Sequence, residues 1–249
     1  MKQFIFILAA LILSTNIYAQ HSKRRTSTVK WISLTLKGGY GNSILFNSDV
    51  SADENVSIDY LSPAYNMGGS LGLTFGDNVG VFFEGLSSTF KQNYEINTGT
   101  TVYTKTQEFK SMDMGIALRY TSDYGFYVEA GPIFNNLKKA TETNTTTVLP
   151  RDNYIDNFTN NYTSMMFTMG FAAFRGDRIS VNLGLRGTYA FSDFVENSSF
   201  YVLNDGVYHG ASTAAASNPF SAKVMLEVKY FFAFWGDATC GRGRIMFFQ

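Results

Sequence analysis

Alternation of apolar and polar residues is the sequence feature that most restricts the fold of this chain. Over residues 111–120, every even-numbered residue from Met112 to Tyr120 is large and apolar, whereas the odd-numbered residues are small or polar. Successive side chains of a strand point to opposite faces, so this period of two predicts a strand with one apolar and one polar face. The same pattern recurs along the chain and predicts eight strands, over residues 30–46, 63–75, 79–92, 104–121, 125–139, 162–175, 178–194 and 219–234.

The connections between these segments alternate in length. Residues 76–78, 121–124 and 176–177 are short and rich in Gly, Asp, Asn and Ser, whereas residues 47–62, 93–103, 140–161 and 195–218 form long polar stretches. Short periplasmic turns that alternate with long external loops are typical of outer-membrane barrels. The strands, at about 13 to 18 residues, also exceed the five or six that are usual in globular sheets. We therefore predict an all-β fold, an eight-stranded antiparallel up-and-down transmembrane β-barrel, in preference to a soluble sandwich.

The N-terminus has the features of an export signal. Lys2 precedes an apolar run from Phe4 to Leu13, and Ala19 is a small residue suited to cleavage. This run is too short to cross a bilayer as a helix. We expect a signal peptide at 1–19, an N-terminal periplasmic segment at 20–29, the barrel at 30–234 and a C-terminal tail at 235–249. The predicted location is the cell outer membrane.

Composition excludes several classes of protein. The chain has 20 basic and 20 acidic residues, so it lacks the basic excess of a nucleic-acid-binding protein. Charged residues make up 16% of the chain, well below the roughly 25% of soluble domains. Cys240 is the single cysteine, which excludes a disulfide scaffold. A membrane protein whose polar residues face a closed interior accounts for this composition.

Aromatic residues collect at the ends of the predicted strands, as in the aromatic girdles of membrane barrels. The expected girdle at the turn end comprises Trp31, Phe75, Tyr120, Tyr124, Phe126, Phe174, Phe234 and Trp235. The expected girdle at the loop end comprises Tyr40, Tyr65, Phe90, Phe134, Tyr162, Phe191 and Phe194.

An apolar face turned to lipid leaves a set of charged residues on the inward face. They are Lys37, Glu84, Asp113, Arg119, Glu129, Arg186, Lys223, Glu227 and Lys229. Because side chains fill the interior of an eight-stranded barrel, these charges must pair with one another or bind trapped water. We predict a structural salt-bridge network that plugs the lumen, and a proton or ion path is the alternative. Arg119 is expected to pair with one or more of Glu84, Asp113 and Glu129.

No arrangement of residues indicates catalysis. The two histidines are His21, which precedes the barrel, and His209, which lies in the last long loop near Asp205 and Ser212. A Ser–His–acid site in that loop remains an open alternative, but no Cys or His spacing indicates a metal. We predict no catalytic, cofactor-binding or metal-binding residues, no cofactor and no enzyme activity.

The eight amphipathic strands and the alternating turn and loop lengths resemble the small outer-membrane β-barrel superfamily, the OmpA/OmpX-like barrels. Leu36-Lys37-Gly38-Gly39-Tyr40 and Met67-Gly68-Gly69-Ser70-Leu71-Gly72 are similar to Gly- and Tyr-rich strands of the Bacteroidota outer membrane β-barrel and PorT-like families. The resemblance implies a structural or surface-binding envelope protein, a transport or secretion accessory, or an outer-membrane lipid-modifying enzyme.

The first of these roles is the one we expect, with binding through the long external loops. The expected partners are outer-membrane lipids, the barrel-assembly machinery during insertion, and a surface or periplasmic protein. No nucleic acid is expected among them.

Overall fold

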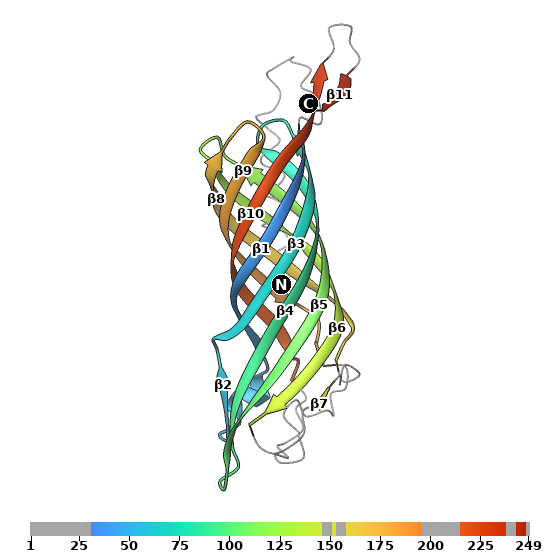
Figure 1. The fold of residues 1–249 in the computed structure, drawn as a ribbon. Helices are drawn as coiled ribbons and strands as arrows, with labels where there is room; N and C mark the ends of the chain where they lie inside the picture. Colours follow the sequence, from blue (N-terminus) through green and yellow to red (C-terminus); the bar gives the residue numbers. More distant parts are fainter. Residues whose placement is uncertain (1–30, 146–150, 153–157, 196–214, 238–242, 248–249) are drawn as a thin grey trace, which may run out of the picture.

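The computed structural model describes residues 31–145, 151–152, 158–195, 215–237 and 243–247. Its architecture is a closed antiparallel barrel (Figure 1). Each strand pairs with its neighbours in chain order, and β1 pairs with β10 from Trp31↔Phe234 to Phe46↔Asn218. This last pairing closes the sheet, so no edge runs along the barrel wall.

Eight strands form the ring, which confirms the predicted fold. They are β1 (Trp31–Phe46), β3 (Ser62–Phe75), β4 (Val79–Asn97), β5 (Val102–Thr121), β6 (Phe126–Asn144), β8 (Asn161–Arg175), β9 (Ile179–Ala190) and β10 (Asn218–Asp237). Within the described residues, no helix is long and apolar enough to cross a membrane.

The prediction of a long loop over residues 93–103 is wrong. β4 and β5 stay paired as far as Asn97↔Val102, so only a tight turn over residues 98–101 joins them. Gly99 has φ +82 in this turn, a conformation that favours glycine. β4 and β5 therefore form a long hairpin at the loop end of the barrel.

Short elements occupy parts of the other long connections. Helix α2 (Ser48–Ala52) and β2 (Val56–Asp59) lie between β1 and β3, and β2 pairs with the distal part of β4. β7 (Arg151–Asp152) pairs with β6. β11 (Gly243–Phe247) returns along β10, which continues to Asp237, three residues past the predicted end of the barrel at 234. Residues 1–30, which include the predicted signal peptide and N-terminal segment, lie outside the described residues, as does Cys240.

A belt of exposed apolar side chains surrounds the barrel. It includes Leu34, Leu36, Met67, Leu71, Phe83, Met112, Met114, Ile116, Leu118, Phe126, Phe134, Met165, Phe167, Met169, Phe171, Leu185, Val224, Leu226 and Val228. Contact of this apolar face with lipid costs little free energy, whereas contact with water would be unfavourable. This apolar belt is the membrane-facing surface.

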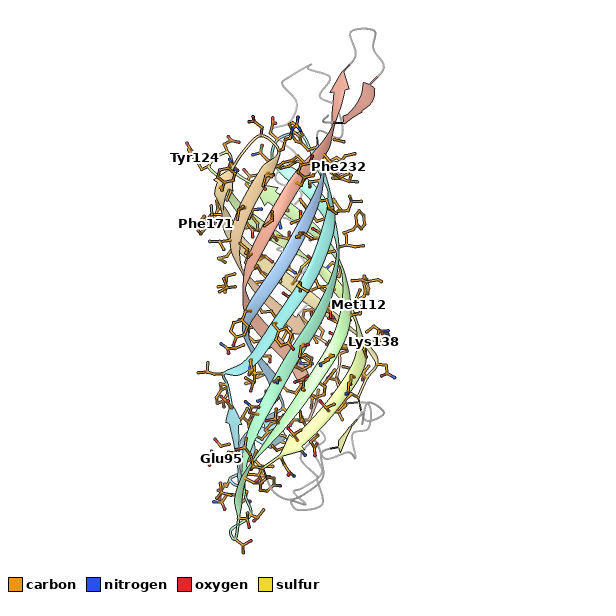
Figure 2. The ribbon with its side chains drawn as sticks, viewed as in Figure 1. Glu95, Met112, Tyr124, Lys138, Phe171 and Phe232 are labelled. Atoms are coloured by element: carbon orange, nitrogen blue, oxygen red, sulfur yellow. The ribbon has the colours of Figure 1, made fainter. Side chains whose placement is uncertain are left out.

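The apolar belt ends abruptly toward the loop end. On the outer face of β5, Met112 is followed by Lys110 and Glu108, and on β6 Phe134 is followed by Asn136 and Lys138. Figure 2 shows Glu95 far beyond the level of Met112 and Lys138. From Lys110 to Val102 the strand extends for roughly 26 Å, at about 3.3 Å per residue. The β4–β5 hairpin therefore stands out from the membrane.

Beyond that boundary the apolar and polar faces exchange places. Tyr94, Ile96 and Tyr103 point inward and are buried, while Glu95 and Thr104 point outward. The inward residues pack in a cluster with Ile44, Val50 and Ile58, and burial raises the pKa of the Tyr94 phenol. We call β2, β7 and the parts of β4, β5 and β6 beyond the apolar belt the projecting sheet. Its apolar core is the interior of a water-exposed domain.

The predicted aromatic girdles are partly wrong. At the loop end, Tyr40, Tyr65, Phe134 and Phe191 are exposed on the outside as expected. Phe90, Tyr162 and Phe194 are buried instead, with at most 9% of their surface exposed. Phe90 shares the inward face of β4 with Glu84, so strand parity points it into the lumen. At the turn end, Tyr120, Tyr124, Phe126 and Phe174 are exposed.

Candidate functional site in the barrel lumen

The structure places the side chains of all nine predicted charged residues in the barrel lumen. Each has an exposed fraction of 9% or less. They come from β1, β4, β5, β6, β9 and β10, where each shares its strand's inward parity. Six of them form one connected group, which we call the charge layer: Lys37, Glu84, Arg119, Glu129, Arg186 and Glu227.

Arg119 lies at one side of the charge layer. Its Nε donates to Glu129 Oε2 at 2.7 Å, and its Nη2 donates to Glu227 Oε1 at 2.8 Å. The guanidinium lies between two aromatic rings, 4.6 Å from the centroid of Phe82 and 4.3 Å from that of Tyr127. Glu129 is one of the three partners that the sequence suggested, whereas Glu227 was not among them.

Arg186 and Lys37 complete the charge layer. Arg186 donates to both oxygens of Glu84, at 2.8 and 3.1 Å, and to Glu129 Oε1 at 2.7 Å. Its Nε donates to the Thr168 hydroxyl at 3.0 Å. Lys37 Nζ donates to Glu84 at 2.8 Å. Each of the three carboxylates is thus shared between cations.

Register and lumen width together determine these pairs. Lys37 is directly opposite Glu227 in the β1–β10 ladder, and Arg119 is opposite Glu129 in the β5–β6 ladder. Arg186 is opposite its hydroxyl partner Thr168 in the β8–β9 ladder, and the other ion pairs cross the lumen between strands that are not neighbours. Three cations and three carboxylates leave the charge layer neutral, which offsets much of the cost of burying each ion.

The other three predicted residues lie outside the charge layer. Asp113 accepts a hydrogen bond from Ser111 Oγ at 2.7 Å, and Lys223 donates to Ser221 Oγ at 2.8 Å. Both line a small chamber of about 40 Å³ on the loop side of the charge layer. Lys229 faces the turn end, with Nζ 4.8 Å from the Phe82 ring centroid.

A second barrier, which the sequence reasoning missed, lies beyond the small chamber. Its core is formed by Phe90, Phe109, Phe158, Tyr162 and Phe194, which we call the aromatic plug. Phe109 stacks on Phe90 with centroids 4.8 Å apart and meets Phe158 and Phe194 edge-on. Phe109 has the same parity as Asp113 and Arg119, so the alternation that predicted the inward charges also indicated its position.

Further buried polar residues lie on the loop side of the lumen and were also missed. Lys105 and Glu142 form an ion pair at 3.0 Å with at most 5% of either side chain exposed. Gln92 is fully buried, and its side-chain oxygen accepts from the Leu45 amide at 2.8 Å while its amide donates to Asp59. Glu142 falls in residues 140–161, which were assigned to a loop. Gln92 and Lys105 lie at the ends of the predicted strands 79–92 and 104–121, and their inward side of the strand was predictable from the alternation.

The arrangement restricts what the lumen can do chemically. The charge layer and the aromatic plug both lie across the lumen, and the cations and carboxylates of the charge layer are hydrogen-bonded to one another. In the described part of the chain, no three His, Cys, Asp or Glu side chains are placed to hold a metal ion. His209, Asp205 and Ser212, the residues of the alternative catalytic site, lie outside the described residues.

Searches against known proteins gave structural matches only. No protein-family model matches the chain, and no curated protein matches its sequence. OprG from Pseudomonas aeruginosa is similar in structure, with 10% identity, a TM-score of 0.40, and coverage of 83% of this chain and 98% of OprG. Ail of Yersinia pestis matches with 10% identity, a TM-score of 0.39, and coverage of 82% and 99%.

The outer-membrane protease OmpT from Escherichia coli matches with 8% identity, a TM-score of 0.28, and coverage of 86% and 99%. Identities and scores this low leave the role of the chain to be argued from its own residues. The closed ring of eight strands, the apolar belt and the polar interior define an outer-membrane β-barrel. The protein therefore belongs to the outer membrane.

Removal of Arg119 tests the structural importance of the charge layer. Arg119→Leu leaves Glu129 and Glu227 with fewer cationic partners in a buried site, which should lower the free energy of unfolding by about 3–5 kcal/mol. Adding Glu227→Gln restores the charge balance and should recover part of this loss. The measurement is a urea titration in detergent, in which the gel shift between the folded and the unfolded barrel reports the folded fraction.

The matched control is Lys91→Leu, which breaks an ion pair with Glu108 just beyond the apolar belt. Lys91 and Glu108 are partly exposed, with Nζ and Oε2 2.8 Å apart. An exposed pair of this kind should contribute no more than about 1 kcal/mol. Equal losses from Arg119→Leu and Lys91→Leu would contradict a structural role for the charge layer.

Proposed function

We propose that this protein is a non-enzymatic, sealed outer-membrane barrel that presents the projecting sheet as a surface for binding at the cell exterior. One observation carries the proposal: the lumen is filled in two successive layers, while the strands continue as an ordered sheet well beyond the apolar belt. A barrel built to conduct would need an open lumen, and a passive anchor would not need the projection.

The filled lumen supports the absence of conduction. Ions that pass the charge layer would have to separate Arg119, Arg186 and Lys37 from carboxylates within hydrogen-bonding distance. They would then meet the aromatic plug, whose rings lie 4.8 to 5.7 Å apart between centroids. Breaking a buried ion pair without a replacement partner costs several kcal/mol. Both layers therefore oppose ion flow.

The projecting sheet supports a binding role. A groove of about 570 Å³ lies where β2 meets β4, and it is lined by Asp59, Tyr60, Asn93 and Glu95 among others. Tyr60 and Leu61 are exposed over 65% and 72% of their surface. An exposed aromatic ring beside polar groups on a rigid sheet is a common basis for protein or glycan contacts. The cluster of Tyr94, Ile96 and Tyr103 holds this surface in place from behind.

The alternative is a transport or secretion accessory of the Bacteroidota PorT-like kind. Such a protein would contact partners at the turn end, and the open cavity there, lined by Arg119 and Lys229, is the observation that favours it. A lipid-modifying enzyme has no described site in its favour.

Planar-bilayer recordings test the sealed lumen. The wild-type protein should give no steady channels, because the charge layer and the aromatic plug each block the lumen. Phe109→Ala removes the central ring of the plug and should still give no steady channels, since the charge layer remains. Large, steady conductance from the wild-type protein would contradict the proposal and favour transport.

Surface labelling tests whether the projecting sheet reaches the cell exterior. In a Cys240→Ser background, Thr100→Cys places a thiol in the β4–β5 turn and Asp177→Cys places one in the short β8–β9 turn. A membrane-impermeant maleimide should label Thr100→Cys on intact cells, and Asp177→Cys only after the outer membrane is opened. The reverse pattern would place the projecting sheet in the periplasm and overturn a surface-binding role.

A further inference from the structure

A cavity of about 280 Å³ opens at the turn end of the barrel, on the side of the charge layer away from the projecting sheet. Arg119, Lys229 and Tyr127 line it toward the charge layer, and Trp31 and Phe231 supply aromatic walls. Residues of the short turns, including Asp77 and Gly125, form its rim. Unlike the charge layer and the aromatic plug, this space is not filled by side chains.

Lys229 brings to the cavity a charge without an ion-pair partner among the described residues, and Asp77, Arg175 and Asp177 are the other charged residues nearer the rim. Lys229 is 8% exposed, and it forms no ion pair or hydrogen bond with any residue that the structure describes. Its Nζ contacts the Phe82 ring at 4.8 Å and the Phe231 ring at 5.8 Å from the centroids. The nine predicted inward charges are five cations and four carboxylates, and the carboxylates of the charge layer are already shared among Lys37, Arg119 and Arg186.

Tyr127 adds a hydrogen-bond donor without a partner. Tyr127 is 2% exposed, and its hydroxyl has no hydrogen bond in the described structure. Gly184 makes room for it, because a Cβ there would lie 2.4 Å from the hydroxyl oxygen. A buried hydroxyl without a partner is costly, and natural proteins rarely retain one. The absence of a side chain at Gly184 therefore leaves room for a hydroxyl that has no hydrogen-bond partner among the described residues.

We propose that this cavity binds a small organic carboxylate. The anion would neutralise the Lys229 ammonium and accept a hydrogen bond from Tyr127, and its apolar body would rest against Trp31 and Phe231. Cavities of about 150 Å³ hold a benzene molecule, so this one has room for an aromatic acid. The site is at the opposite end of the barrel from the projecting sheet, so it does not depend on the surface-binding role.

The probe is 4-fluorobenzoate, observed by ¹⁹F NMR with the purified protein in dodecyl maltoside micelles. 4-Fluorobenzamide, which has the same shape without the charge, measures partition into micelles. Wild-type protein should give a saturable shift with the benzoate and only a weak, linear change with the benzamide. Charge-assisted hydrogen bonds contribute about 1.5–3 kcal/mol, so Lys229→Met should weaken benzoate binding by about tenfold or more.

Two further variants separate recognition of the anion from general effects on the barrel. Tyr127→Phe removes the hydroxyl alone and should weaken binding by roughly three- to tenfold. Lys223→Met also removes a buried lumen cation, but on the far side of the charge layer, and should retain wild-type affinity. Each variant is first checked for folding by its gel shift.

A second readout remains if Lys229→Met fails to fold. With Trp235→Phe, Trp31 is the remaining tryptophan, and its emission should change with the same saturation curve as the ¹⁹F shift. Binding that is equal for benzoate and benzamide, or equally weakened by Lys223→Met and Lys229→Met, would overturn the proposal. So would a saturable ¹⁹F shift that leaves Trp31 emission unchanged.

Discussion

In lipid, a backbone amide or carbonyl without a partner costs several kcal/mol, and the pairing of β1 with β10 removes the last open edge of the sheet. Closure with eight strands gives a narrow lumen that side chains can fill. Every inward position must then be packed or neutralised. The charge layer, the aromatic plug and the polar chamber between them are three ways in which this chain meets that requirement.

Strand alternation was enough to predict the ring and its inward charges. Residues 111–120 carry both faces clearly, and the structure has β5 over them with Met112 outward and Arg119 inward. The parity of each strand places a residue inside or outside without any knowledge of its partners. What it cannot give is the distance across the lumen, because this depends on how far each strand is shifted along its neighbours. The contacts of Arg119 with Glu227, and of Arg186 with Glu84, were therefore out of reach.

The pairing of β4 with β5 over residues 93–103 was missed for a different reason. The prediction placed the apolar face of every strand outward, which holds only where the barrel is surrounded by lipid. Beyond the apolar belt the solvent outside is water, so the apolar residues Tyr94 and Ile96 turn inward while the strand keeps its geometric parity. The hydrophobic pattern reverses between Phe83, which faces lipid, and Tyr94, which faces a core. In a strand that continues from lipid into water, the apolar residues change from the outward to the inward face. The position of this change in the sequence marks the boundary of the membrane.

The central claim is that Arg119 and Arg186 are buried, paired and shielded from water in a sealed lumen. Proton exchange at their Nε–H groups, measured by NMR on the wild-type barrel in micelles, tests this most directly. In each residue this proton is held by a carboxylate or a hydroxyl, Glu129 for Arg119 and Thr168 for Arg186. The account predicts exchange far slower than for exposed Arg175. Exchange as fast as that of Arg175 would mean that water reaches the charge layer, and the lumen would not be sealed.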